Sequence, residues 1–182
     1  DSTLAMLLFQ YSPGYTGSIL FNGQQLRGID RQSLYHRVGY IAQTTYLFND
    51  TLRSNICLGE DFPEGQLTHA VETAGLSDWV STLPDGLDTT LGPGGTPLSA
   101  GEEQLVAFAR LLVRDVAVVV LDEATARMDP VTESLVVMAS DRLLTGRTGI
   151  LVAHRLTTTA RADLVAVLDH GRGRWPYAVH WN

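Results

Sequence analysis

The most strongly patterned part of the chain predicts a helix that leads into a buried strand. Apolar residues recur at the spacing i, i+3, i+4, i+7, which is typical of one apolar face of a helix. These residues are Leu105, Phe108, Ala109 and Leu112. An almost unbroken, β-branched apolar run follows at 116–121, and such a run suits a strand that is covered on both faces.

Polar residues mark both ends of this helix and strand. Ser99 and Glu102 form a capping-box pattern, so the helix is expected to begin there. Asp122 and Glu123 directly follow the apolar strand. Because open α/β sheets bind ligands at the carboxyl ends of their strands, these carboxylates are candidate site residues. The alternative is a simple helix cap and a strand end that meets solvent.

Further elements are predicted on both sides of this unit. Strands are expected at 18–21, 38–42, 149–153 and 164–168. Helices are expected twice within 64–83 and along Val131, Leu135 and Met138, and a short helix or a turn is expected at 29–36. Turns are expected at 22–23, 84–86 and 169–172. Residues 89–97 are rich in Gly and Pro and are expected to be irregular. Residues 173–182 are expected to form a tail that has no helical or strand period and exposes Trp175, Tyr177 and Trp181.

Composition narrows the class of protein. A chain of 182 residues is long enough for one domain with a sizeable core. Its net charge of -7 argues against a nucleic-acid-binding surface, which would be basic. Cys57 is the single cysteine, so no disulfide can form within the chain. No apolar run approaches the roughly 18 residues that span a bilayer. No signal peptide is visible, and because the chain lacks an initiator Met we expect a fragment.

The order of motifs resembles one family. LSAGE at 98–102, VVVLDEAT at 118–125 and MD at 128–129 resemble the signature motif, Walker B motif and D-loop of ATP-binding cassette (ABC) proteins. This resemblance implies a P-loop NTPase (RecA-like) α/β core with an inserted ABC α-helical subdomain, in which the first strands and most of the P-loop are missing. It implies a core lobe at about 1–43 and 116–172, a helical lobe at about 44–115 and an atypical tail at 173–182.

The resemblance also assigns a role to individual residues. Glu123 is implied as the general base, His154 as the switch residue that contacts the γ-phosphate, and Gln43 as the Q-loop residue near Mg²⁺ and the attacking water. The implied cofactors are ATP and Mg²⁺. The implied metal ligands are Ser2, Gln43 and Asp122, and the implied cofactor-binding residues are Ser2, Thr3, Ser99, Ala100, Gly101, Glu102 and Asp129.

Some positions depart from the family pattern. Asp1 stands where the family has the P-loop lysine, and a carboxylate there would repel phosphates. Pro93 replaces a usual glutamate, and Glu103 replaces a commonly basic residue. These departures keep a degenerate, non-catalytic cassette open as an alternative. Independently of the resemblance, Asp129-Pro130 also fits a helix cap and a first-turn proline.

A second motif implies partners. VGYIAQTTYLFNDTLRSNI at 38–56 resembles the Q-loop and the following segment of exporter-type cassettes. The resemblance implies that residues 44–56 face a transmembrane domain and that Tyr46, Leu47 and Phe48 are exposed for it; the alternative is that they belong to the core. It further implies a second ABC cassette, ATP hydrolysis that drives transport, and a position at the cytoplasmic face of the plasma (inner) membrane. A non-transport ABC ATPase is the remaining alternative.

Overall fold

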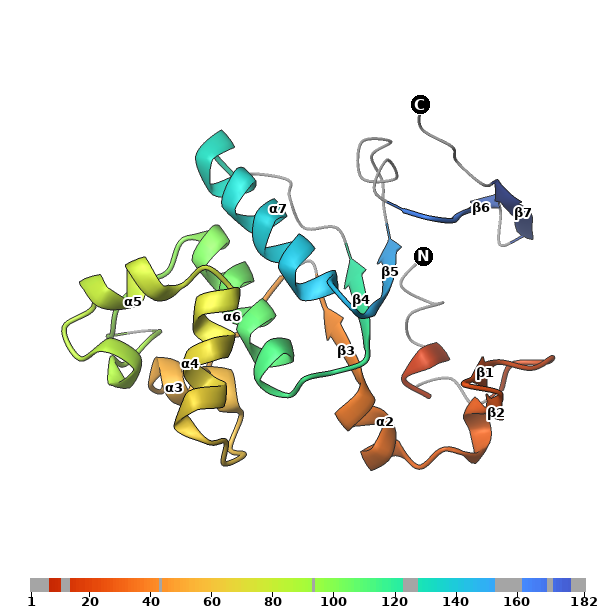
Figure 1. The fold of residues 1–182 in the computed structure, drawn as a ribbon, viewed down its shortest axis with the longest axis horizontal. Helices are drawn as coiled ribbons and strands as arrows, with labels where there is room; N and C mark the ends of the chain where they lie inside the picture. Colours follow the sequence, from red (N-terminus) through yellow and green to blue (C-terminus); the bar gives the residue numbers. More distant parts are fainter. Residues whose placement is uncertain are drawn as a thin grey trace.

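A three-stranded parallel sheet lies at the centre of the fold, with the strand order β3-β4-β5 (Figure 1). The computed structural model describes residues 7–10, 14–42, 44–92, 94–122, 128–152, 162–169 and 172–177. The strands are β3 (Val38–Ile41), β4 (Val118–Asp122) and β5 (Thr148–Val152). Both pairings are parallel, so the carboxyl ends of the three strands meet at one edge of the sheet.

The central strand β4 is buried on both of its faces, as its apolar sequence predicted. Val119 packs into the large core cluster together with Ile41 and Phe108. Val120 points to the opposite face, where it packs with Leu26 and other residues of a second cluster. The alternation of side chains along a strand therefore divides β4 between two apolar layers.

Two long helices cover the face of the large cluster. They are α6 (Ala100–Val113) and α7 (Pro130–Leu144), and they pack against each other. The predicted face of α6 is confirmed for Leu105, Phe108 and Ala109, while Leu112 is only partly buried. Because α6 contacts α3, α4, α7 and β3, its buried surface is wider than the predicted stripe.

The apolar positions that predicted α7 lie on its outer face. Val131, Leu135 and Met138 are all at least half exposed. The buried face of α7 consists of Val136, Ala139 and Leu143.

In the described part of the chain, no helix is both long and apolar enough to span a bilayer.

A group of shorter helices lies on the side of α6 that faces away from the sheet (Figure 1). They are α3 (Leu52–Cys57), α4 (Glu64–Thr73), α5 (Ser77–Thr82) and the 3₁₀ helix η2 (Gly86–Asp88). Of these, α3 and α4 contact α6, while η2 contacts α3 and α5 contacts η2. The predicted stop at Gly75 is confirmed: its φ of 76° permits the Leu76 N–H to bond the Val71 carbonyl, which closes the helix end. The lobe boundaries near 44 and 115 stay a prediction, since one buried cluster joins α6 to the sheet.

The opposite face of the sheet is covered by the segment that precedes β3. This segment contains β1 (Leu20–Phe21), β2 (Gln24–Gln25), η1 (Leu26–Gly28) and α2 (Arg31–Arg37). The predicted Asn22-Gly23 turn is confirmed, with φ of 49° and 78° joining β1 to β2 as an antiparallel hairpin.

The expected irregular tail is wrong for its first part. The strand β7 (Arg172–Tyr177) pairs antiparallel with β6 (Val165–Asp169), and Asp169 lies opposite Arg172. The physical reason is that ladder hydrogen bonds come from the backbone, so a neighbouring strand supports pairing where the side-chain pattern shows no period. Residues 178–182, including Trp181, lie outside the described residues.

Candidate functional site

Asp122 lies at the carboxyl edge of the sheet, as predicted. It is the last residue of the central strand β4, and its Oδ2 accepts a hydrogen bond of 3.0 Å from the Tyr40 hydroxyl. Tyr40 belongs to the neighbouring strand β3, and its ring packs edge-on against Phe9 with 5.8 Å between ring centres. Strand pairing thus brings an oxygen-rich pair to the edge where α/β sheets bind ligands.

The other residues predicted for this edge lie outside the described part of the chain. They are Ser2, Thr3, Gln43, Glu123 and His154. Among the strands that precede them, β3 ends at Ile41, β4 at Asp122 and β5 at Val152, all at the same edge. The roles of Gln43, Glu123 and His154 therefore stay predictions, although the three strands that lead to them are confirmed.

Tyr40 was missed by sequence reasoning, which treated it only as a strand residue. Burial raises the pKa of its hydroxyl above the ordinary value, and the hydrogen bond and charge of Asp122 raise the pKa further. The hydroxyl therefore stays protonated at neutral pH and donates to the carboxylate. The available signal was its place near the end of a predicted strand, while the pairing of that strand with the acidic one is seen only in the structure.

Replacing Tyr40 with Phe removes this hydroxyl and keeps the ring. We expect Tyr40→Phe to lower the free energy of unfolding by about 0.5–1.5 kcal/mol, the range for one hydrogen bond. Urea denaturation measures the change, with Tyr46→Phe as the control because the Tyr46 side chain is largely exposed. Equal effects of both substitutions would contradict a specific contribution of the Tyr40–Asp122 bond.

The chemistry of Asp122 suits Mg²⁺. This ion prefers oxygen ligands and is usually held by one or two carboxylates together with phosphates of the substrate and water. The residues that the structure describes contain no group of three or more His, Cys, Asp or Glu side chains that could hold a metal. Asp122 is therefore the candidate carboxylate ligand within the described residues, and the implied ligands Ser2 and Gln43 stay predictions.

The amino end of α6 carries the predicted capping box. The Glu102 N–H donates to Ser99 Oγ (3.2 Å), and the Ser99 N–H donates to Glu102 Oε2 (2.7 Å). Ser99 and Ala100 are exposed, so the positive end of the helix dipole faces outward. Since the Glu102 carboxylate is engaged with this helix start, a nucleotide contact by Glu102 stays a prediction.

Gly101 is needed for packing inside this chain. It is buried, and a Cβ atom placed on it would lie 2.0 Å from Cγ2 of Thr132 in α7. The resemblance implies that Gly101 binds nucleotide, and this role stays a prediction; the structure shows in addition a close approach of α7. Thr132, which sequence reasoning missed, therefore connects the amino end of α7 to that of α6.

Asp129 is the predicted cap of α7, and this role is confirmed. Its Oδ1 accepts hydrogen bonds of 3.1 Å from the backbone N–H groups of Val131 and Thr132, and Pro130 is the first helical residue. Hydrogen bonds from the side chain and then the backbone of Thr132 lower the pKa of Asp129 below its ordinary value. The carboxylate is thus anionic at neutral pH, and a contact with nucleotide stays a prediction.

A second candidate surface lies in the segment 44–56. The side chains of Tyr46 and Phe48 are 72% and 50% exposed, and their rings meet edge-to-face with 5.0 Å between centres. The expectation that Leu47 is also exposed is wrong, because Leu47 packs against the large core cluster. Leu47 is therefore half-buried against the core, while its two neighbours are exposed.

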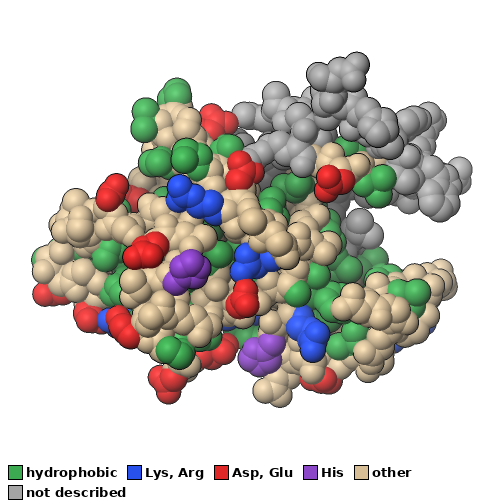
Figure 2. Space-filling view, viewed as in Figure 1, with side chains coloured by type: hydrophobic (Ala, Val, Ile, Leu, Met, Phe, Trp, Pro, Cys, Tyr) green, Lys and Arg blue, Asp and Glu red, His purple; other side chains and the backbone are tan. Residues whose placement is uncertain are grey.

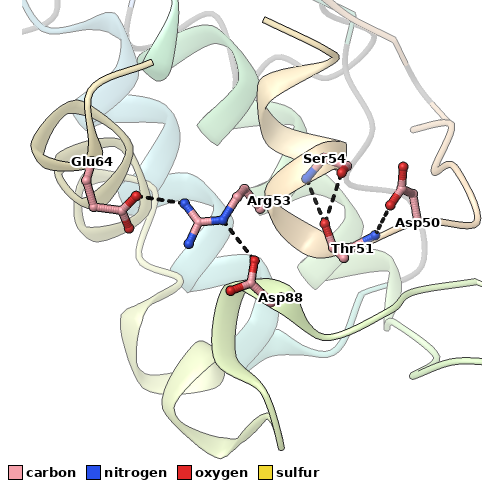
Figure 3. Close-up of polar contacts among 6 residues, drawn as sticks. All are labelled: Asp50, Thr51, Arg53, Ser54, Glu64 and Asp88. Atoms are coloured by element: carbon pink, nitrogen blue, oxygen red, sulfur yellow. Dashed lines mark hydrogen bonds and ion pairs between the residues drawn. The ribbon is translucent and has the colours of Figure 1, made fainter. Parts of the chain in front are cut away.

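The rest of this motif builds the scaffold of that surface (Figure 3). Thr51 caps α3 by accepting from the Ser54 N–H (3.1 Å). Arg53 bridges Glu64 at 2.8 Å and Asp88 at 2.9 Å, which ties α3 to α4 and η2. These ion pairs raise the pKa of Arg53 above its ordinary value.

The face of the molecule in Figure 2 is not basic. Figure 2 shows acidic, basic and apolar side chains interspersed on the face in view. Together with the net charge of -7, this distribution lacks the clustered Lys and Arg residues that bind a phosphate backbone. Nothing on that face indicates a nucleic-acid interface.

Comparison with known proteins places this arrangement in a family. The sequence profile described as ABC transporter matches residues 1–126. The chain belongs to the ABC transporter family. The mycobactin import ATP-binding/permease protein IrtA of Mycobacterium tuberculosis is 44% identical over 172 residues, which are 94% of this chain and 20% of that protein. The ATP-dependent lipid A-core flippase of Ralstonia nicotianae is 37% identical over 175 residues, or 94% of this chain and 30% of that protein.

A solved structure confirms the fold class of this ABC chain. It is the structure of a bacterial Atm1-family ABC exporter with ATP bound, and it matches with a TM-score of 0.85 and 38% identity over 97% of this chain and 31% of the exporter. The predicted P-loop NTPase core is therefore confirmed. The chain spans less than one third of the length of each of these three proteins.

Proposed function

We propose that this chain is the nucleotide-binding domain of an exporter-type ABC transporter, and that it binds and hydrolyses ATP to drive transmembrane transport. The observation that carries this proposal is the position of Asp122 at the carboxyl end of the central parallel strand in a chain of the ABC transporter family. ATP binding follows from the family, while hydrolysis and transport belong to the proposal.

Each residue has a role in this proposal. Asp122 holds Mg²⁺, directly or through water, together with Ser2 and Gln43, and the Tyr40 hydroxyl orients the Asp122 carboxylate. Bound Mg²⁺ would neutralise charge on the transferred phosphoryl group. Glu123 accepts the proton of the attacking water as general base. His154 stabilises charge that develops on the γ-phosphate.

The proposed partner for hydrolysis is a second ABC cassette. Ser99 and Gly101 lie at the amino end of α6, where free N–H groups and the helix dipole favour an anion. In the proposal this end contacts the nucleotide of the other cassette. The capped amino end of α7 at Asp129 lies beside it through the contact of Gly101 with Thr132, so both helix ends can face the same partner.

The proposed partner for transport is a transmembrane domain of the same transporter. Tyr46 and Phe48 form an exposed aromatic pair in the segment 44–56 that the motif assigns to this contact. The named relatives include a flippase and an ATP-binding/permease protein, both much longer than this chain. We place the domain at the cytoplasmic face of the plasma (inner) membrane.

The proposal is tested by hydrolysis in the full-length protein. We expect Asp122→Asn to lower Mg-ATP hydrolysis by at least about tenfold, because the site loses a charged oxygen ligand. Asp78→Asn in α5 is the matched control and should leave the rate unchanged. A wild-type protein that binds ATP without hydrolysing it would support the non-catalytic cassette instead. Hydrolysis by a protein without membrane helices would support a non-transport ATPase.

A further inference from the structure

Asn55 holds the backbone of the segment that presents Tyr46 and Phe48. The Asn55 side chain is fully buried in α3, and its Oδ1 accepts from the Phe48 N–H at 2.8 Å. Its Nδ2 donates to the carbonyls of Phe48 (3.0 Å), Asp50 (3.3 Å) and Thr51 (3.0 Å). One buried amide therefore satisfies several backbone groups of an irregular segment, which would otherwise need water.

Arg110 of α6 holds the same segment from the other side. Its Nε donates to the Asn55 carbonyl at 2.7 Å, and its Nη2 donates to the Tyr46 carbonyl at 2.8 Å and to Asn55 Oδ1 at 3.3 Å. The planar guanidinium, with several donors in fixed directions, can contact two segments at once, which a lysine cannot do in the same geometry.

The contacts of Arg110 within the described residues are made to uncharged groups. The three described oxygens that accept from Arg110 belong to two backbone carbonyls and one side-chain amide, and burial lowers the pKa of Arg110. Burying a charge is costly, so its hydrogen bonds to the segment must offset that cost. By contrast, Arg53 at the other side of α3 pairs with two carboxylates. The contacts of Arg110 thus serve the shape of the segment rather than charge neutralisation.

The consequence is a pair of aromatic rings fixed outside the core. The backbone of Tyr46 and Phe48 is tied by Arg110 and Asn55, while Leu47 between them is anchored in the core. The two rings keep an edge-to-face geometry although both are largely exposed. Rigid aromatic side chains lose little conformational entropy on binding, which makes them efficient anchors in interfaces.

We propose that Arg110 and Asn55 are positioning residues that hold the Tyr46 and Phe48 rings for docking of an apolar segment of the transporter's membrane domain. The identity of this partner rests on the proposed function. The chain spans less than one third of its named relatives, so most of the transporter's length remains to supply such a segment. Because Arg110 belongs to α6, the docking surface is attached to the same helix that begins at Ser99.

The first experiment measures amide hydrogen exchange in the full-length protein with Arg110→Gln. We expect exchange at 46–51 to rise about tenfold, the change that corresponds to the loss of a hydrogen bond or two. Arg114→Gln is the matched control, since Arg114 donates to the Tyr35 carbonyl and stacks on the Tyr35 ring, away from this segment. Unchanged exchange at 46–51, or an equal rise throughout α4, would overturn the proposed positioning role.

The second experiment measures docking. A photoreactive phenylalanine analogue at position 48 should cross-link to the membrane domain, and Arg110→Gln should reduce both the cross-link yield and the stimulation of ATP hydrolysis by transported substrate several-fold. Basal hydrolysis should stay within about twofold, with Arg110→Lys in between. Faster exchange with undiminished cross-linking and stimulation would overturn the inference. If the protein that carries the analogue at position 48 and no other substitution forms no cross-link to a membrane domain, the proposed function fails, whatever the exchange result.

Discussion

Replacing Glu123 with Gln is expected to leave ATP binding by the full-length protein intact and to lower its turnover by about 10²- to 10⁴-fold, the usual contribution of a general base. Glu123 directly follows Asp122 in the sequence, and Asp122 is the last residue of β4 at the edge of the sheet where ligands bind. Glutamine keeps the size of the side chain but cannot accept a proton. Phosphate release measures turnover, and calorimetry with Mg-ATP measures binding.

The control for this prediction is Glu72→Gln. Glu72 is an exposed residue of α4, far along the chain from the sheet edge, and its replacement should change neither quantity. Wild-type turnover in the Glu123→Gln protein would show that another group accepts the proton. Loss of ATP binding together with turnover would indicate that Glu123 supports the bound nucleotide rather than the attacking water.

Replacing Gly101 with Ala should destabilise the domain by about 1–3 kcal/mol, the usual cost of overpacking a filled core. The new Cβ would lie 2.0 Å from Cγ2 of Thr132, so α6 and α7 must separate or Thr132 must leave its rotamer. Thr132→Ser removes Cγ2 and keeps the hydroxyl, so it should restore most of the lost stability in the double variant. Urea denaturation of the single and double variants measures both effects.

Gly65→Ala is the matched control for this substitution. Gly65 lies in the first turn of α4, and nothing lies within 4 Å of a Cβ placed there. Alanine has the higher helix propensity, so Gly65→Ala should be neutral or stabilising by up to about 1 kcal/mol. A Gly101→Ala protein that is as stable as the wild type, or that Thr132→Ser fails to rescue, would contradict the packing argument.

The same double variant separates two roles of Gly101. If stability and ATP hydrolysis both return, the glycine is required because α7 packs closely against α6. If stability returns while hydrolysis remains low, Gly101 also contacts the nucleotide, as its place in the signature motif implies. Stability and hydrolysis must therefore be measured on the same preparations.

Local signals in the sequence were sufficient for several elements. The capping box at Ser99, the cap at Asp129 and the turn at Asn22-Gly23 were predicted and are confirmed. Each of them depends on hydrogen bonds or backbone angles within a few residues, so the identity of neighbouring residues is enough to specify them. The buried strand β4 was predicted for a similar reason, because a continuous apolar run needs cover on both faces.

Features that depend on distant partners were not predicted. The Tyr40 hydroxyl and Asp122 are 82 positions apart, and Arg110 and Asn55 are 55 apart. In neither pair does the sequence around one residue indicate which residue it contacts. Leu47 was predicted to be exposed and the residues of β7 to be irregular, and both predictions were wrong for the same reason. Leu47 packs against the core, and β7 pairs with β6, so distant contacts decide both.

The sequence by itself determined the family, the two long helices α6 and α7, the three strands of the central sheet, and the residues that carry the proposed chemistry, because motif spacing and local patterns are properties of the chain. Only the tertiary structure decided which of these residues meet. It brought Tyr40 to Asp122, packed Thr132 against Gly101, and held Tyr46 and Phe48 outward through Asn55 and Arg110. The physical reason is that these contacts form only when strands and helices pack against each other. Packing brings together residues that lie far apart in the chain.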